Sequence, residues 1–333
     1  MDNFAHAFTG AVVGRALAPN ITKPFSRRFL LANMAIANLP DIDLLLTLFG
    51  RKVYTYHHRG FTHSLFGLCL MIPIALILFR LIMGKDFFIK YKKMNIPKQL
   101  IIVITQLVFS HFFLDYLTSF GTMLLYPLSM QRFSFPLMFI IDPLFWLITG
   151  LGCLTCYLIN WKSTKQRFLS ALVTLCLIIC LWGIEWSFKN RAHFLVKNIQ
   201  ARVQSYPMPL APLLWNVIQL TPDSFLQHTV SFKNPAEPKI MRHSLLPFNQ
   251  IDQKCQNLTN KKSRAHLEYY KSFAELPYCL SSQDGCHCVS LKYSIPALGK
   301  SSFAEQHFVN TPLKVSTKKR SRKDRWEKLK ILY

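Results

Sequence analysis

The first 190 residues of the chain alternate between long apolar runs and short basic loops. A helix needs roughly 20 apolar residues to cross a bilayer. Four runs meet this length: Leu65–Met83, Leu100–Phe120, Phe135–Ile159 and Phe168–Trp186. Four such runs in succession are hard to explain without lipid, so the pattern predicts at least four membrane helices.

Two weaker helical patterns precede these runs. Phe4–Leu17 and Phe29–Leu39 are short and less apolar, and three basic residues separate them. If both cross the bilayer, the total is six segments. Otherwise Met1–Leu39 forms a re-entrant hairpin. We therefore expect a mainly α fold, a polytopic membrane helical bundle of about four to six segments.

The polarity of the chain changes near Phe188. Hydrophobic residues make up 51% of the chain and the mean hydropathy is +0.20, but these residues concentrate before that point. We predict a membrane-embedded domain over residues 1–187. A C-terminal soluble domain of mixed α/β or β-rich structure is expected over 188–310, followed by a basic tail over 311–333.

The net charge of +24 bears on topology. Lys and Arg collect in cytoplasmic loops, and the loops at 85–98 and 162–167 are strongly basic. These loops are expected in the cytoplasm, with residues 121–134 and the domain after Phe188 outside. No aromatic stacking platform lies beside the basic tail, so the expected partner is the lipid bilayer, and no nucleic acid is expected at the site.

Ionisable side chains at membrane depth are costly, and by default they mark function. The topology above rests on Lys and Arg alone, yet it places nine histidines and aspartates at one outer boundary. They are His6, Asp41, Asp43, His57, His58, His63, His111, Asp115 and Asp142. The convergence of such distant segments predicts a single site.

Two pairs of residues have the spacing of metal ligands. His111 and Asp115 are about one helical turn apart and share a face, so they can bind one cation, or the carboxylate can orient an imidazole. A buried hydrogen-bonded pair joining two helices is the alternative. Asp41 and Asp43 follow Pro40 at a spacing of two, so both can face one cation or share a proton. The alternative there is a plain Asp-rich turn.

Three histidines fall within seven residues, together with Arg59, whose planar fork suits a phosphate or carboxylate. Thr62 is expected to cap the next helix, so that His58 and His63 converge from the loop and the first turn. Polar residues at a membrane interface are the alternative, and the same holds for the lone His6.

Nitrogen and oxygen ligands without cysteine suit zinc, and also manganese or iron. Such a divalent cation lowers the pKa of bound water and polarises a phosphoryl or carbonyl oxygen. The sequence contains no serine nucleophile elbow, phosphate-binding P-loop or dinucleotide fingerprint. A metal-ion or proton-coupled transporter and a non-catalytic membrane scaffold are competing interpretations. Transport is disfavoured because the spans offer almost no His or Asp toward the cytoplasmic end.

Four motifs carry a family resemblance: Asn38–Asp43, His58–Ser64, His111–Thr122 and Ile141–Pro143. In order and spacing, from about Met1 to Phe188, they resemble the YdjM-like membrane-bound metal-dependent hydrolases, also described as LexA-binding, inner-membrane-associated hydrolases. The resemblance implies a multi-pass protein of the bacterial cytoplasmic (inner) membrane. The family is remotely similar to zinc-dependent phospholipase C and single-strand-specific zinc nucleases. That similarity implies a phosphoester substrate, such as a lipid or a cell-envelope metabolite.

The resemblance also implies roles for individual residues. The metal ligands would be His6, Asp43, His58, His63, His111 and Asp115. Asp41, His57 and Asp142 would support these ligands, with Asp41 or Asp43 as the general base and Arg59 as a substrate clamp. The zinc enzymes also use their N-terminal amine, for which the sequence shows no counterpart, so the number of metal ions stays open.

Four of the nine cysteines lie in the C-terminal domain: Cys255, Cys279, Cys286 and Cys288. An even number of cysteines outside the membrane permits disulfides, although their pairing cannot be read from the sequence.

Overall fold

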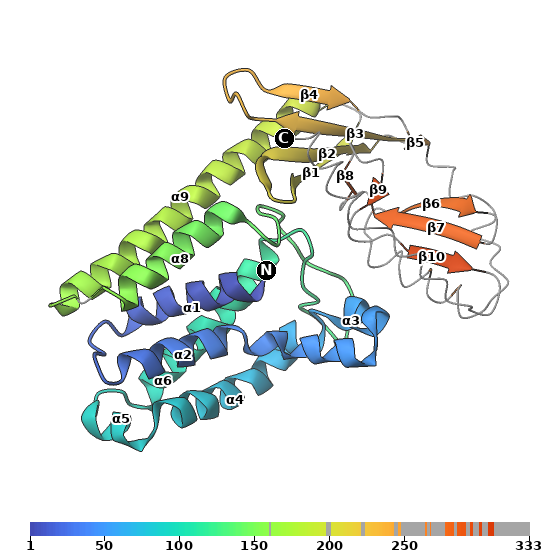
Figure 1. Ribbon diagram of the computed structural model, residues 1–333. Coiled ribbons are helices and arrows are strands. Elements are labelled where there is room, and N and C mark those ends of the chain that lie inside the picture. The colour runs from blue at the N-terminus through green and yellow to red at the C-terminus, as the bar shows by residue number, and fades with distance from the viewer. Residues whose placement is uncertain are drawn as a thin grey trace, which may run out of the picture. The chain divides into compact units, whose positions relative to one another are not determined.

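The computed structural model describes residues 1–159, 161–197, 201–220 and 224–242, and shorter segments between residues 246 and 309 (Figure 1). The chain forms two compact units. One comprises Met1–Lys189 and Pro209–Pro212, and the other comprises the rest of the chain.

The first unit is helical. Its elements are α1 (Asn3–Leu17), α2 (Ser26–Ala37), the 3₁₀ segment η1 (Leu39–Phe49), α3 (Arg51–His57), the 3₁₀ turn η2 (Phe61–His63), α4 (Leu65–Met83), α5 (Lys85–Lys90), α6 (Ile96–Leu107), the π-helical turn η3 (Val108–Phe113), α7 (Leu114–Tyr116), α8 (Pro143–Tyr157) and the long helix α9 (Thr164–Val196).

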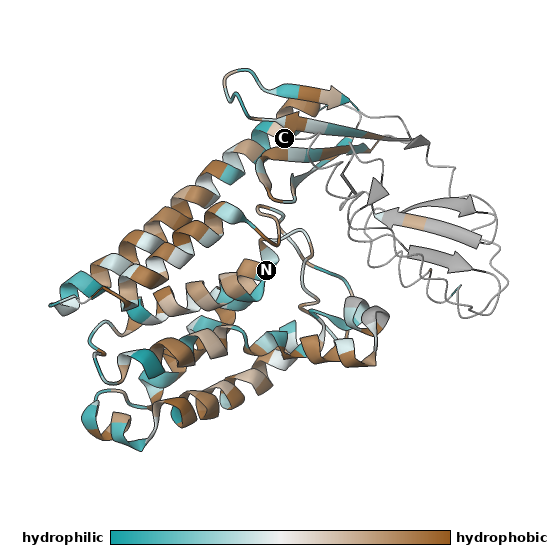
Figure 2. Ribbon diagram, in the orientation of Figure 1, coloured by the Kyte–Doolittle hydropathy of each residue, from teal (hydrophilic) through white to brown (hydrophobic). Residues whose placement is uncertain are grey.

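Three helices are long and apolar enough to cross a membrane: α4, the continuous helix Ile96–Tyr116 and α9. Figure 2 shows α4 and α9 as largely hydrophobic along their length. The pair α2 and η1 is bent by 56° and gives a fourth span if it crosses as one. The prediction of about four to six segments was therefore too high, since the described residues supply three, or four with the bent pair.

The difference arises first at the apolar run Phe135–Ile159. Only α8 is helical, for 15 residues, because Asp142 caps its start by accepting a hydrogen bond from Phe145 N at 2.8 Å. The residues before the cap are irregular, and Met138 pairs there with Thr118. A hydrophobic run that includes such a segment is longer than the helix within it.

The second difference concerns α1, predicted as a weak helix over Phe4–Leu17. It packs against α2, α6 and α8 and buries polar side chains such as His6, Thr9 and Arg15. Its apolar content is low because protein surrounds it on several sides. At 15 residues it is also shorter than a full membrane span.

Small residues let α1 and α2 approach closely. A Cβ added to Gly14 would lie 2.3 Å from Cγ of Asn33, and one on Gly10 would lie 2.6 Å from Cβ of Ala37. Gln106 of α6 donates to Gly10 O at 3.0 Å and to Asn33 Oδ1 at 2.7 Å. In a membrane, the hydrophobic effect does not drive helices together. Close packing of the backbones and buried hydrogen bonds of side-chain amides stabilise the helix pair instead.

The α4 helix starts at Ser64, whose hydroxyl accepts from Gly67 N at 3.0 Å. The expectation that Thr62 caps this helix was wrong, because Thr62 lies inside the preceding turn η2. The correction matters for the site, since Thr62 is then available for contacts with other side chains.

The second unit is rich in antiparallel strands, as the β-rich form of the prediction expected. Its strands are β1 (Arg202–Met208), β2 (Ala211–Leu220), β3 (Ser224–Ser231), β4 (Lys239–Arg242), β5 (Leu246–Pro247), β6 (Pro277–Ser282), β7 (Gly285–Ser290), β8 (Ser294–Ile295), β9 (Lys300–Ser301) and β10 (Gln306–Val309). One sheet has the order β1-β2-β3-β4, with β5 also paired to β3, and a smaller sheet has the order β10-β7-β6. Cys288 of β7 is disulfide-bonded.

Candidate metal site

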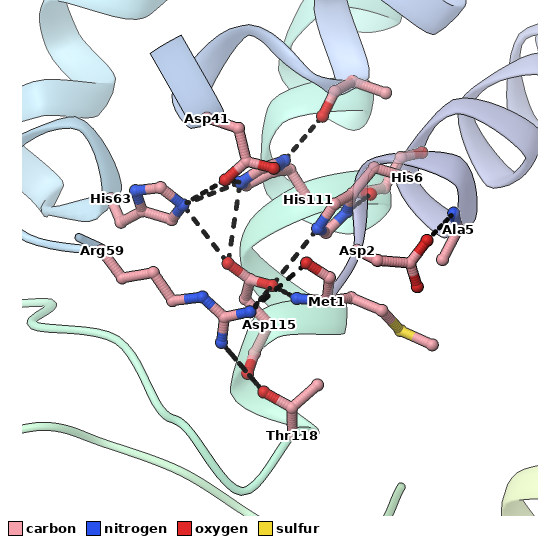
Figure 3. Close-up of polar contacts among 12 residues, drawn as sticks. Met1, Asp2, Ala5, His6, Asp41, Arg59, His63, His111, Asp115 and Thr118 are labelled. Carbon is pink, nitrogen blue, oxygen red and sulfur yellow. Dashed lines mark hydrogen bonds and ion pairs between the residues drawn. The ribbon is translucent and has the colours of Figure 1, made fainter. Parts of the chain in front are cut away.

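Five segments of the helical unit meet at a buried cluster of imidazoles and carboxylates (Figure 3). The contributing elements are α1, η1, the loop after α3, η2 and the helix formed by η3 and α7. They bring together His6, Asp41, Asp43, His58, Arg59, His63, His111 and Asp115.

The local sequence explains two of these positions. Pro40 stands in the first turn of η1, so Asp41 and Asp43 fall on a tight 3₁₀ segment instead of continuing α2. His111 lies in the π-helical turn of the continuous helix Ile96–Tyr116. Such turns insert one residue into an α-helix and are frequent at functional sites.

The centre of the cluster consists of four residues: Asp41, His63, His111 and Asp115. One ligand atom from each lies within 4.8 Å of all the others. Nε2 of His63 is 3.4 Å from Asp41 Oδ1 and 3.3 Å from Asp115 Oδ2, and Nε2 of His111 is 3.7 Å from each of the same oxygens. All four side chains are buried, so water provides no screening there.

Hydrogen bonds to the backbone fix the tautomers of two histidines. His111 Nδ1 lies 2.6 Å from Ala37 O, and His6 Nδ1 lies 2.8 Å from Ser110 O. A carbonyl oxygen only accepts, so each Nδ1 carries the hydrogen. Each Nε2 then presents a lone pair, and both face the carboxylates of the cluster.

His63 has the same arrangement through a side chain. The Thr62 hydroxyl donates to Asp43 Oδ2 at 3.2 Å, so it accepts from His63 Nδ1 at 2.9 Å. The Nε2 atoms of His63 and His111 are therefore both acceptors, and they lie 2.9 Å apart. Two lone pairs at this distance, beside two carboxylates, repel one another unless a cation or a proton lies between them.

Among the residues that the structure describes, three polar atoms of the cluster find no hydrogen-bond partner. They are His6 Nε2, Asp41 Oδ2 and Asp115 Oδ2. Buried polar atoms are nearly always paired, because each unpaired one costs free energy. The donor set, with histidine nitrogens and aspartate oxygens and no cysteine, therefore fits a divalent cation.

Asp43 organises the loop beside the centre. Its Oδ1 lies 2.9 Å from His58 Nδ1, and its Oδ2 accepts from the Arg59 backbone N at 2.9 Å and from Thr62. Arg59 has φ of 59°, in the left-handed region that non-glycine residues rarely adopt. The strain of this backbone is offset by the bonds to Asp43. Asp41, Asp43 and His58 also form a second group with ligand spacing.

Arg59 points inward and binds the central carboxylate. Its Nη2 lies 2.8 Å from Asp115 Oδ1 and its Nη1 donates to Thr118 Oγ1 at 2.9 Å, with 1% of the residue exposed. Phe120 packs on the guanidinium, 5.1 Å from its ring centre. The amino group of Met1 also contacts Asp115 Oδ1. Sequence reasoning missed Thr118 and gave Thr62 a different role. It also found no counterpart of the N-terminal amine that the zinc enzymes use, which was wrong, since the Met1 amine lies at Asp115.

Two predicted residues lie outside the cluster. Asp142 caps α8, as described above. His57 is exposed at the end of α3 and lines a pocket of ≈ 350 Å³. Asp43 and Thr62 reach this pocket from the cluster side, and the rest of its wall is mostly apolar, including Leu45 and Phe49.

Burial controls the protonation of the loop histidines. It lowers the pKa of His58 to about 4, against the opposing effect of the hydrogen bond and charge of Asp43. Burial also lowers the pKa of His63. Both imidazoles are therefore neutral at pH 7, which is the form that binds metal ions.

The apolar helices and the buried His/Asp cluster define a helical membrane protein with a candidate metal site. Comparison with known families agrees: the profile of the YdjM inner membrane protein matches residues 1–190, and the chain belongs to this family. The predicted family is thereby confirmed.

One relative illustrates how far similarity extends. The chain is 27% identical over 147 residues to the uncharacterized protein YfhP of Bacillus subtilis (strain 168). The match covers 43% of this chain and 42% of that protein, so it spans less than half of the relative's length. No solved structure matches the chain.

Proposed function

We propose that this protein is a membrane-bound, metal-dependent hydrolase that cleaves phosphoester bonds. One observation carries the proposal. His63 and His111 both use Nδ1 for a hydrogen bond, so that two Nε2 lone pairs 2.9 Å apart face Asp41 and Asp115. A divalent cation would remove this repulsion, and all four side chains could hold it.

These four residues would hold the cation, with zinc as the first choice for their nitrogen and oxygen atoms. A cation bound there supplies a water of lowered pKa and polarises a phosphoryl oxygen. Asp41 is the proton acceptor we favour, because its Oδ2 is buried and makes no hydrogen bond within the described part of the chain. Asp43, by contrast, already accepts three hydrogen bonds and is assigned to orienting His58 and Thr62.

Arg59 is assigned a positioning role in place of the substrate clamp expected from sequence. Its guanidinium is buried on Asp115 and Thr118, which leaves it poorly placed to reach a ligand. By neutralising one oxygen of Asp115, it leaves the other oxygen directed at His63 and His111.

The pocket beside Asp43 supports an amphipathic substrate. Its wall is largely apolar, and the neighbouring η1 surface exposes 80% of Leu48 and 75% of Phe49. A lipid phosphoester would fit both regions, with its phosphate at the His/Asp cluster and its acyl or prenyl chain along the apolar surface. Lipids of the bilayer are the natural source of such molecules.

The cluster is proposed to lie at the outer boundary of the cytoplasmic membrane, with the second unit outside the cytoplasm. The disulfide at Cys288 supports this orientation, because disulfides persist in oxidising compartments. The basic loops at 85–98 and 162–167 would then face the cytoplasm.

The interior of the bundle favours hydrolysis over ion transport. Between the cluster and the basic loops, the buried polar side chains include the amides Asn33, Gln99 and Gln106. Helices α2, α4 and α6 contain no carboxylate or imidazole to relay a proton or a metal ion toward the basic loops.

The test is the metal content of the purified full-length protein, measured by elemental analysis. Wild type should carry metal, and His63→Ala and His111→Ala should lose most of it, together with hydrolysis of phosphodiester lipids in mixed micelles. His193→Ala on α9 is the matched control and should keep both. Full metal content in the His63 and His111 variants would refute the site, and metal binding without hydrolysis of any phosphoester would refute the assigned reaction.

A further inference from the structure

A second pocket lies between the start of α2 and the end of α8, among the basic loops. Its volume is ≈ 350 Å³. One part of its wall is polar and basic, with Lys23, Ser26 and Arg27, and the other part is apolar, with Leu30, Leu31 and Leu158. A wall divided in this way matches a ligand that has an anionic head and a hydrocarbon tail.

The buried, positively charged side chain of Arg15 lies behind the polar part of this wall. Arg15 is 1% exposed, donates to Ile21 O at 2.7 Å and to Ser26 Oγ at 2.8 Å, and stacks 4.1 Å above the ring of Tyr157. Within the described part of the chain it makes no ion pair, and its Nε makes no hydrogen bond. A buried charge without a counter-charge is costly, so an anion in the pocket would be drawn to it.

The Ser26 hydroxyl connects Arg15 to the pocket. It accepts a hydrogen bond from Arg15 and lines the cavity, so its own hydrogen can be donated to an anionic oxygen there. With Lys23 and Arg27 at the rim, three donors surround one end of the pocket, and two of them are charged.

The surrounding surface lacks anions that could neutralise these groups. The helix ends and loops at 15–28, 80–98 and 162–167 carry thirteen Lys and Arg residues and a single carboxylate, Asp86. Hydrogen bonds such as Arg28 to Met83 O and Arg167 to Pro19 O hold these loops at the same end of the bundle. Basic residues near a membrane surface attract anionic lipid headgroups.

The apolar part of the wall is exposed toward the lipid. Leu31 of α2 is 58% exposed, and Leu158, directly after the end of α8, is 74% exposed. An acyl chain can follow these side chains while the phosphate stays at the level of Lys23 and Arg27.

We propose that this pocket binds an anionic phospholipid from the membrane leaflet that lies next to the basic loops. The phosphate is held by Lys23, Arg27 and Ser26, with Arg15 behind them, and one acyl chain lies along Leu31 and Leu158. The site is separate from the His/Asp cluster and does not depend on the proposed hydrolase reaction.

The test uses the full-length protein in detergent, with native mass spectrometry to count retained lipids. Phosphatidylglycerol should bind at least ten times more tightly than phosphatidylcholine. Lys23→Gln/Arg27→Gln should abolish most of this preference. Lys92→Gln/Lys93→Gln, which removes the same charge from an exposed loop at the same end, should leave it intact. Equal loss in both double variants would mean general surface electrostatics and would overturn the proposal.

A competition experiment on the wild-type protein tests the proposal even if a variant fails to fold. Phosphatidylglycerol should stay bound in the presence of a large excess of inorganic phosphate, because the acyl chain contributes to binding. Displacement by phosphate alone would identify a site for the free ion and overturn the lipid assignment. Retention of metal by the Lys23/Arg27 variant, measured alongside, shows that the two sites are independent.

Discussion

The ion pair between Arg59 and Asp115 offers the sharpest test of the electrostatics of the site. Both side chains are fully buried and their closest atoms lie 2.8 Å apart. Removing one partner of a buried pair leaves an uncompensated charge and costs roughly 3–5 kcal/mol. Asp115→Asn should approach this cost, because it leaves the Arg59 guanidinium without its carboxylate.

Arg59→Met should cost less, about 1–3 kcal/mol, since Asp115 still contacts the amino group of Met1. The double variant buries no unpaired charge from this pair. We therefore expect it to lose no more than Asp115→Asn alone, which corresponds to a coupling energy at least as large as the cost of Arg59→Met, about 1–3 kcal/mol. The four proteins, wild type, the two single variants and the double variant, form a double-mutant cycle. Equilibrium unfolding in detergent measures the free energy of unfolding of each, with a chelator present so that metal does not contribute.

The metal content of the same variants separates the two roles. Asp115→Asn should lose metal because a ligand is weakened, whereas Arg59→Met should retain it with lower affinity. If the two energy losses simply add to within about 0.5 kcal/mol, the pair does not interact as described. If Arg59→Met alone abolishes metal binding, Arg59 is more than a positioning residue.

The remaining predictions concern pH and helix packing. His58 has a folded-state pKa of about 4 against an ordinary 6.5, so the chelator-treated protein should lose stability as pH falls from 6.5 through 4, and His58→Gln should flatten this dependence in thermal melts. Gly14→Ala should destabilise by about 1–3 kcal/mol in chemical unfolding, because its Cβ would meet Asn33, whereas Gly183→Ala, with open space around it, should be neutral or stabilising. Gly10→Ala should also lower the metal content, because its Cβ would push on Ala37, whose carbonyl anchors His111; unchanged metal content would show that this anchor is dispensable.

Much of the helical unit could be predicted from the sequence. The run Leu65–Met83 coincides with α4, because a lipid-facing helix is apolar on nearly every side. The run Phe135–Ile159 does not coincide with a single helix, because loops that pack against a membrane bundle are apolar as well. Hydropathy records burial in any apolar medium and does not distinguish lipid from protein.

The residues of the cluster were predictable for a different reason. Buried charges such as Asp41 and Asp115 are rare in apolar segments, so their presence alone marks a site. Their contacts could not be predicted, since the partners of His111 and His6 are backbone carbonyls of Ala37 and Ser110. A carbonyl occurs at every residue, and only the packing of the helices selects one.

The same hydrogen bonds bear on whether the cluster is a scaffold or a metal site. A purely structural cluster would be expected to direct imidazole N–H groups at the carboxylates, because that arrangement satisfies donor and acceptor together. Here the N–H groups of His6 and His111 point away, to main-chain oxygens, and the lone pairs point in, toward Asp115. This costs stability in the absence of a cation, and it is the orientation that metal-binding histidines adopt. The arrangement is therefore better explained by binding of a cation than by tying helices together.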